Sequence, residues 1–260
     1  MTQFVTVNGA LLEVETFFAE SSRAPDTALV LLHEGLGCIA LWKDFPQRLA
    51  DQTRLDVVAY SRVGYGGSAP VEIPRPLNYM QIEGEEWVPQ VLDLLPYQKF
   101  ILVGHSDGGS IALVHSGSNP GERLLGTVTL AAHVHNEPLC VASIEKAKVA
   151  YESGTLREGL ARHHGDNVDC AFWGWNQAWL HPDFLDFNIE EYLPRIQVPV
   201  LAVQGEQDEY GSKTQVDTIV EHAGGPAEPL MIPNCRHSIH RDAPETLLSA
   251  IDKFSNQLIS

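Results

Sequence analysis

The stretch Gly104-His105-Ser106-Asp107-Gly108-Gly109 decides the fold, because it stands between a short apolar run and a helix-like segment. The preceding run FILV at 100–103 predicts a buried strand, and SIALVH at 110–115 predicts the start of a helix. A serine in G-x-S-x-G between a strand and a helix is typical of a sharp turn that exposes a nucleophile. Glycines at 104 and 108 leave room for that turn, since a Cβ there would meet neighbouring backbone. We therefore expect Ser106 Oγ to project from a sheet, with the Asp107 N–H free to face an oxyanion.

Strand-like and helix-like segments alternate on both sides of this turn. Continuous apolar runs predict strands that are covered on both faces; they lie at 28–32, 55–60, 99–103, 125–131, 198–204 and 229–232. Helix-like segments lie between them, at 41–52, 79–95, 108–116, 215–222 and 244–258. Residues 4–17, with Asn8-Gly9 in the middle, predict a β-hairpin. The alternation predicts an α/β fold with a mostly parallel central sheet flanked by helices.

The alternation stops between residues 136 and 196. Two helix-like stretches lie there, at 139–153 and 156–163, followed by a tryptophan-rich segment at 172–179. We expect a core domain of residues 1–135 and 197–260, with 136–196 as a small helical cap inserted late in the sheet. Trp173, Trp175 and Trp179 either pack the cap onto the core or line an apolar substrate pocket beneath it, and the two readings are compatible.

Two polar residues complete a pattern that begins with Ser106. A serine hydroxyl needs a base, and the base needs an orienting acid, before serine becomes an effective nucleophile. Asp208 follows the strand-like run 198–204, and His237 follows the next strand-like run and precedes the last helix. Catalytic groups collect at the carboxyl edge of a parallel sheet. The chain order Ser106, Asp208, His237 therefore predicts a catalytic triad.

Four segments in this order resemble the α/β-hydrolase-fold serine hydrolases, and the likeness covers nearly the whole chain. The segment LLHEGLG at 31–37 resembles the family's H-G-x-x-G oxyanion segment. The segment YSRVGYGGS at 60–68 resembles its D-x-R-G-x-G-x-S loop, with Ser61 in place of the usual aspartate. Residues 198–208 resemble the acid-bearing segment, and residues 237–244 resemble the family's G-H-x-x-x-x-E-x-P ending.

The resemblance implies roles for the matching residues. Ser106 would be the nucleophile, His237 the general base and then the acid, and Asp208 the carboxylate that orients His237. The backbone N–H groups of Gly35 and Asp107 would form the oxyanion hole. This chemistry needs no cofactor, and no metal site is expected.

Glu34 is the main departure from the family pattern, because it stands where glycine is usual. Its carboxylate either recognises a polar or cationic group of the substrate or accepts hydrogen bonds from loop N–H groups. The substitution also leaves open whether Gly35 or Leu36 supplies the second oxyanion donor.

Other polar residues near the triad also have two readings. Asp107 either sits as a favourable charge at the following helix N-terminus or contacts substrate. His240 is a rival base, although the spacing of the terminal motif favours His237. His133 and His135 follow the strand that leads into the cap, and either could contact substrate or only pack. The residues we predict to bind substrate are Glu34, Leu36, His135, Trp173 and Trp175.

Composition limits the partners of the protein. The chain of 260 residues has a formal net charge of −17 and a pI near 4.9, which disfavours nucleic acid and anionic membrane surfaces. No run of apolar residues is long enough to span a bilayer, and no signal peptide is evident at the N-terminus. The four cysteines lack CxxC spacing, which favours a reduced, cytoplasmic protein over a zinc site or disulfides. A small-molecule substrate is the expected partner, and a homodimer is left open.

These observations predict a cofactor-free serine hydrolase that acts on a small ester-type acyl substrate, with carboxylesterase as the first choice. A meta-cleavage C–C hydrolase and an enol-lactonase are rivals on the same triad. They would need a pocket cation for a substrate carboxylate, for which Arg62, Arg162 and Arg236 are candidates. A lyase would need a pocket lysine, and a non-catalytic binding relative would not need the full triad.

Overall fold

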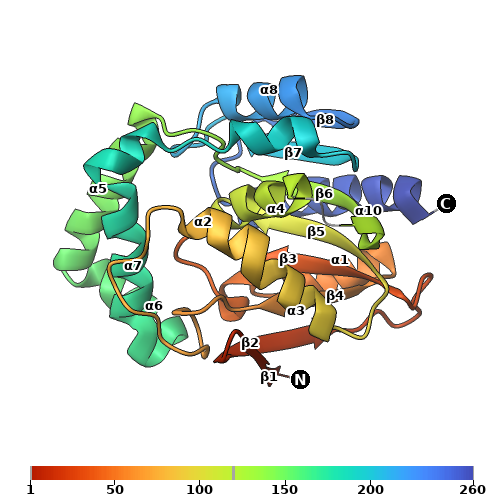
Figure 1. The fold of residues 1–260 in the computed structure, drawn as a ribbon, viewed down its shortest axis with the longest axis horizontal. Helices are drawn as coiled ribbons and strands as arrows, with labels where there is room; N and C mark the ends of the chain where they lie inside the picture. Colours follow the sequence, from red (N-terminus) through yellow and green to blue (C-terminus); the bar gives the residue numbers. More distant parts are fainter. Residues whose placement is uncertain (1, 119–120, 260) are drawn as a thin grey trace.

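The computed structural model describes residues 2–118 and 121–259, within which the strands form one eight-stranded sheet (Figure 1). The strand order is β1-β2-β4-β3-β5-β6-β7-β8; the pairs β1–β2 and β2–β4 are antiparallel, and the remaining neighbours, from β4 to β8, are parallel. The expected hairpin turn is present at Asn8-Gly9, and both residues have positive φ. The strands are β1 (Thr2–Val7), β2 (Ala10–Phe17), β3 (Thr27–Leu32), β4 (Asp56–Tyr60), β5 (Lys99–His105), β6 (Leu124–Leu130), β7 (Val200–Gly205) and β8 (Ala227–Ile232). The predicted α/β fold with a mostly parallel sheet is confirmed.

Helices cover both faces of the sheet because the central strands are apolar on both sides. In β3, Ala28, Val30 and Leu32 belong to one hydrophobic cluster, whereas Leu29 and Leu31 belong to the other. The first cluster includes α3 (Val88–Leu94), α4 (Asp107–Gly117) and α8 (Lys213–His222). The second includes α1 (Phe45–Thr53) and α10 (Pro244–Ile259), which lie behind the sheet in Figure 1. Two short helices, η1 (Ile39–Trp42) and α9 (Ile239–Asp242), and the turn η3 (Gly121–Arg123) complete this part.

The helix expected at 79–95 contains a π-helical turn. It consists of α2 (Tyr79–Ile82), the π turn η2 (Glu83–Trp87) and α3. Gly84 in the π turn lies against α4, where a Cβ would come within 2.8 Å of Ile111 O. His115 Nδ1 contacts the Gly84 carbonyl at 3.1 Å, so a side chain of α4 satisfies the widened turn.

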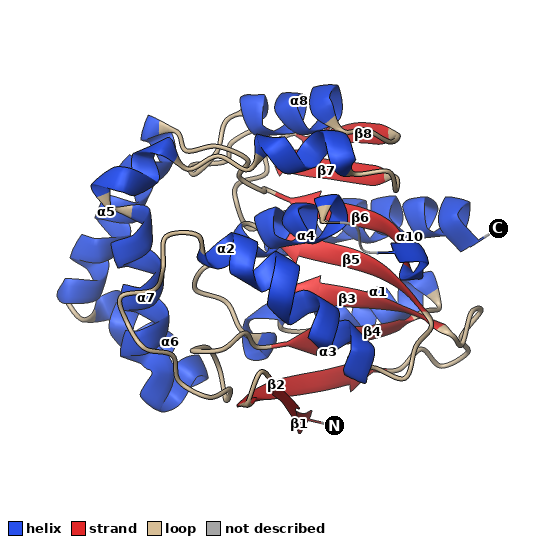
Figure 2. Ribbon diagram, viewed as in Figure 1, coloured by secondary structure: helices blue, strands red, loops and turns tan. Residues whose placement is uncertain are grey.

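Most of the helices between β6 and β7 lie beyond the carboxyl ends of the parallel strands, and we call these helices the cap (Figure 2). The two connections to the core run side by side, because Ile189 N donates to Val134 O at 2.8 Å and His135 pairs with Asn188. The tryptophan-rich segment is helical. The cap contains α5 (Pro138–Glu152), α6 (Thr155–His164), η4 (Gly165–Asn167), α7 (Val168–Trp179) and η5 (Pro182–Asp186). The last helix before β7, η6 (Glu190–Arg195), lies instead against α4, where Tyr192 packs on Gly117. The division of the chain into a core domain and a cap domain stays a prediction.

None of the helices in the described residues has the length and apolar character that crossing a membrane requires.

Gly108→Ala should lower the free energy of unfolding by about 2 kcal/mol or more, because the added Cβ would lie 2.1 Å from the backbone oxygen of Leu32. Urea denaturation followed by circular dichroism measures the change. Gly159→Ala is the matched control, since Gly159 lies in α6 with nothing within 4 Å of its Cβ position. The control should be neutral or stabilising by up to about 1 kcal/mol. Equal stability of the two variants would contradict the tight packing at Gly108.

Candidate functional site

Ser106 lies at a strained turn between β5 and α4. Its φ of 53° and ψ of −120° are rare for a residue with a side chain, and such strain often marks a functional position. A Cβ on Gly104 would lie 2.1 Å from Gly108 O, so the turn closes only with glycine there. The predicted sharp turn is therefore present, and Ser106 itself is 8% exposed.

The structure brings Asp208 and His237 together on neighbouring loops after β7 and β8. Asp208 Oδ1 lies 2.8 Å from His237 Nδ1, a charge-assisted hydrogen-bond distance. Oδ1 also accepts from Tyr210 N at 2.8 Å, and Gln204 Nε2 donates to Oδ2 at 3.2 Å. These bonds hold the Asp208 carboxylate in the orientation that pairs with the His237 imidazole. Among the described residues, Ser106 Oγ makes no hydrogen bond to His237, a contact that often tightens only in a complex.

His237 carries the electrostatic signature of a base paired with a carboxylate. Burial by itself would lower its pKa, but the charge and hydrogen bond of Asp208 outweigh burial and raise the pKa above the usual histidine value. Glu209 and Glu34 add to this increase. For Asp208, burial would raise the pKa, whereas the charge and hydrogen bond of His237 lower it, and the net pKa is lowered.

The rival base His240 has a different environment. Its ring packs 4.9 Å from Trp42, and both of its nitrogens are buried without a partner. Burial, followed by the charge of His105, lowers its pKa to about 3. The Asp208 carboxylate therefore pairs with His237 and not with His240.

Three donors converge on the carbonyl oxygen of Glu34. His33 Nδ1 lies 2.7 Å from it, Arg62 Nη2 donates at 3.0 Å, and Gly37 N donates at 3.0 Å. In a trans peptide the C=O and the following N–H point in opposite directions. Fixing the Glu34 carbonyl therefore fixes the N–H of Gly35, which points away from these donors.

The Glu34 carboxylate is paired with the side chain of His105. Its Oε2 is 3.4 Å from His105 Nδ1, and His105 Nε2 donates to the backbone oxygen of His237 at 2.9 Å. Burial would raise the pKa of Glu34, but the hydrogen bond and charge of His105 hold it well below the usual range. The sequence suggested loop N–H groups or substrate as partners, whereas the partner seen is a side chain next to the nucleophile.

One of the two roles that the sequence suggested for Asp107 is present, because Asp107 is the acidic residue in the first turn of α4, where a negative charge is favourable. Its enclosed carboxylate accepts from Tyr79 OH at 2.5 Å and from Trp179 Nε1 at 3.3 Å, and it makes no capping bond to α4. Burial raises the pKa of Asp107, while the charge of Arg62 and the bond from Tyr79 oppose the increase. Asp107 thus joins the nucleophile turn to α2 and to the cap, and nothing in the sequence pointed to Tyr79.

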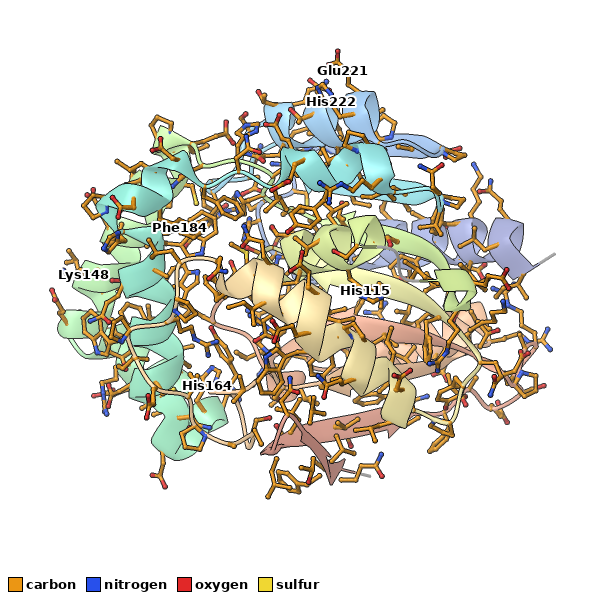
Figure 3. All side chains as sticks on the ribbon, in the orientation of Figure 1. His115, Lys148, His164, Phe184, Glu221 and His222 are labelled. Atoms are coloured by element: carbon orange, nitrogen blue, oxygen red, sulfur yellow. The ribbon has the colours of Figure 1, made fainter. Side chains whose placement is uncertain are left out.

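The cap residues divide between two sides of α7. Trp175 and Trp179 face the core, because Trp175 packs against Gly35 and Trp179 donates to Asp107. Phe184 of η5 also faces the core (Figure 3), and its ring lies 4.9 Å from that of Trp179. Trp173 instead lines an outer groove of about 890 Å³, together with Leu77 and Lys148. The three tryptophans therefore do not share one surface.

Two other predicted substrate-binding residues have partners elsewhere. His135 Nδ1 lies 2.9 Å from Glu190 Oε1, in the paired segments that connect the cap to the core. Leu36 packs against the core, and its carbonyl accepts from His164 Nε2 at 3.0 Å. Neither contacts Ser106 through a hydrogen bond among the described residues.

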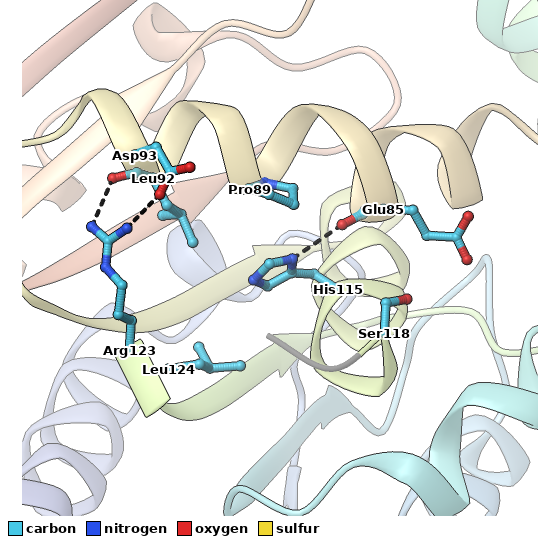
Figure 4. A pocket seen from close by; sticks show the side chains of 9 residues that line it. Glu85, Pro89, Leu92, Asp93, His115, Ser118, Arg123 and Leu124 are labelled. Carbon is cyan, nitrogen blue, oxygen red and sulfur yellow. Dashed lines mark hydrogen bonds and ion pairs between the residues drawn. The ribbon is translucent and has the colours of Figure 1, made fainter. Parts of the chain in front are cut away.

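A small, partly open cavity lies away from these residues, between α3 and the last turn of α4 (Figure 4). It has a volume of about 160 Å³, and its wall includes His115, Arg123 and Leu124. Ser106 precedes the first residue of α4, whereas His115 lies near its other end. The cavity is therefore not part of the site around Ser106.

Comparisons of the sequence and of the structure with known proteins agree with one another. A family model described as alpha/beta hydrolase family matches residues 29–250. The Homo sapiens protein named Serine hydrolase BPHL is 28% identical over 255 residues, covering 91% of this chain and 80% of that protein. The structure of proline iminopeptidase from Mycobacterium smegmatis superimposes with a TM-score of 0.76 at 19% identity, covering 99% of this chain and 98% of that chain. The enol-lactonase from Burkholderia xenovorans LB400 gives 0.75 at 14% identity, covering 98% and 100%.

Asp208→Asn should lower the pKa of His237, because the protonated imidazole loses the charge that stabilises it. NMR titration of the histidine Hε1 signals measures the change, with His237→Gln used to assign the signal. Glu209→Gln is the comparison variant and should lower the pKa by less, since its effect on His237 is smaller. An unchanged or higher pKa in Asp208→Asn would contradict this pairing.

Proposed function

The chain belongs to the alpha/beta hydrolase family, and we propose that it is a cofactor-independent serine hydrolase that cleaves a small ester-type acyl substrate. The observation that carries the proposal is the 2.8 Å pair of Asp208 and His237, at the sheet edge that also holds the strained turn of Ser106. A nucleophile, a base and an orienting carboxylate on three loops are what covalent acyl transfer requires.

In the first half of the reaction, Ser106 Oγ attacks the carbonyl carbon while its proton passes to His237 Nε2. The carbonyl π electrons move to oxygen, and the N–H groups of Gly35 and Asp107 stabilise that oxyanion. His237 then protonates the leaving alkoxide, and the acyl-enzyme remains. Asp208 keeps the imidazole oriented and stabilises its charged form.

In the second half, a water molecule gives a proton to His237 and attacks the acyl carbon. The tetrahedral oxyanion forms again, and its collapse breaks the bond to Ser106 Oγ. His237 returns the proton to the serine, and the carboxylic acid leaves.

The fixed orientation of the Glu34 carbonyl favours Gly35 over Leu36 as the second residue that donates to the oxyanion. The N–H of Gly35 shares its peptide plane with that carbonyl and so points away from His33 and Arg62.

The positions of the basic residues support a neutral ester over a substrate that carries a carboxylate. Arg62 is fully buried, and its Nη2 donates to Glu34 O. Arg236 is paired with Glu209 at 3.1 Å on the surface, and Arg162 is exposed on α6. The C–C hydrolase and enol-lactonase alternatives would need one of these cations free in the pocket. A lyase would need a lysine in the pocket. Lys148, however, is on the outer side of the cap (Figure 3), and Lys213 is paired with Asp217.

A fluorophosphonate probe should label the native protein with a stoichiometry near one. Ser106→Ala should abolish labelling, and His237→Ala should slow it about 1,000-fold or more, because both remove members of one catalytic unit. Gel fluorescence and intact-mass spectrometry follow the reaction. His240→Ala is the matched control and should retain labelling. A native protein that is folded but does not react would refute the proposed mechanism.

Turnover of a panel of p-nitrophenyl esters, thioesters, lactones and ring-cleavage dienoates then separates the substrate classes. We expect ester turnover that disappears in Ser106→Ala. Preferential hydrolysis of a dienoate or an enol-lactone would replace the ester assignment with one of the alternatives.

A further inference from the structure

One cap helix contacts both residues that we propose as oxyanion donors. Trp175 and Trp179 are four residues apart in α7, so their side chains lie on the same face of the helix. Trp175 touches Gly35, and Trp179 donates to Asp107. The inference that follows rests on the function proposed above.

The contact between Trp175 and Gly35 is close. A Cβ built on Gly35 would lie 2.2 Å from Trp175 Nε1 and 2.3 Å from its Cδ1. Such distances cannot be tolerated, so the nitrogen edge of the indole occupies the space where any other residue would place a side chain. The indole nitrogen is thus adjacent to Gly35, whose N–H points away from His33 and Arg62.

The indole N–H of Trp175 has no hydrogen-bond partner among the described residues, although the side chain as a whole is only 6% exposed. Trp42 Nε1 is also without a partner, but it belongs to the fully enclosed polar atoms, whereas Trp175 Nε1 does not. The Trp175 nitrogen is therefore not fully enclosed. Buried indole N–H groups usually have a partner, so an unused donor at this point calls for an acceptor.

Trp179 holds α7 in the position that this contact requires. Its Nε1 lies 3.0 Å from Tyr79 OH and 3.3 Å from Asp107 Oδ1, and the side chain is almost fully enclosed. These bonds connect α7 to the turn that carries Ser106. The position of Trp175 over Gly35 is thus coupled to the nucleophile turn through one turn of helix.

We propose that Trp175 Nε1–H is a third donor of the oxyanion hole, brought to the site by the cap. The two backbone donors come from the core, and the third comes from a side chain of α7. The oxyanion hole is then complete only when the cap lies on the core, which ties substrate enclosure to transition-state stabilisation.

The test compares two tryptophan variants, with the best ester from the panel as substrate. Trp175→Phe keeps an aromatic ring and removes the N–H, whereas Trp87→Phe makes the same change in η2, away from the cap. We expect Trp175→Phe to lower kcat about 10- to 100-fold with KM within about twofold, and Trp87→Phe to leave both nearly unchanged. A trifluoromethyl ketone that mimics the tetrahedral intermediate should lose affinity for Trp175→Phe by the same factor as kcat/KM.

Three results would overturn the assignment. One is an unchanged kcat in a folded Trp175→Phe variant. Another is a change in KM alone, which would show that Trp175 only lines the pocket. The third is a loss in kcat without a matching loss of affinity for the ketone. Thermal melting and fluorophosphonate labelling of Ser106 in each variant show whether the fold and the nucleophile remain intact. If the native protein neither labels nor turns over any ester, the proposed function itself has failed.

Discussion

The carbonyl oxygen of Glu34 is the point on which the arrangement of the site depends. It receives hydrogen bonds from the end of β3 through His33, from the loop after β4 through Arg62, and from its own turn through Gly37. His33 Nε2 accepts from Arg62 N at 3.0 Å, which leaves the ring proton on Nδ1 as the donor to Glu34 O. Burial, and then the charge of Arg62, lower the pKa of His33 and so favour this neutral form. A rotated Glu34–Gly35 peptide would take this acceptor away from three buried donors, so the orientation of the Gly35 N–H is strongly determined.

The same region holds charges that are costly to bury. Arg62, Arg75, Glu83 and Asp107 are all nearly or fully enclosed, and Arg75 Nη1 lies 4.0 Å from Glu83 Oε1. Burial raises the pKa of Glu83, and the charges of Arg62 and Arg75 oppose the increase. Such groups contribute little net stability, but they tolerate few alternative arrangements because an unpaired charge would be worse. They therefore define how α2, the nucleophile turn and the loop after β4 fit together.

The sequence predicted the strands and most helices because each is a local pattern. Apolar runs mark strands covered on both faces, and the glycines at 104 and 108 mark a turn that a Cβ would obstruct. Residues that follow parallel strands meet at one edge, so Ser106, Asp208 and His237 could be grouped before any distance was known. The π turn at Glu83–Trp87 could not be predicted, because it depends on the packing of Gly84 against α4 and on a bond from His115.

By itself, the sequence determined the fold class, the chain order of the proposed triad and the place of the cap between two strands. These follow from periodicity and from the chemistry of single residues, which local sequence records. Only the tertiary structure decided which tryptophan faces the core, that Glu34 contacts His105, and that Asp107 bonds to Tyr79 and Trp179. Each of these contacts joins residues from different segments of the chain. Their partners are chosen by how helices and loops pack, and no single segment of sequence contains that information.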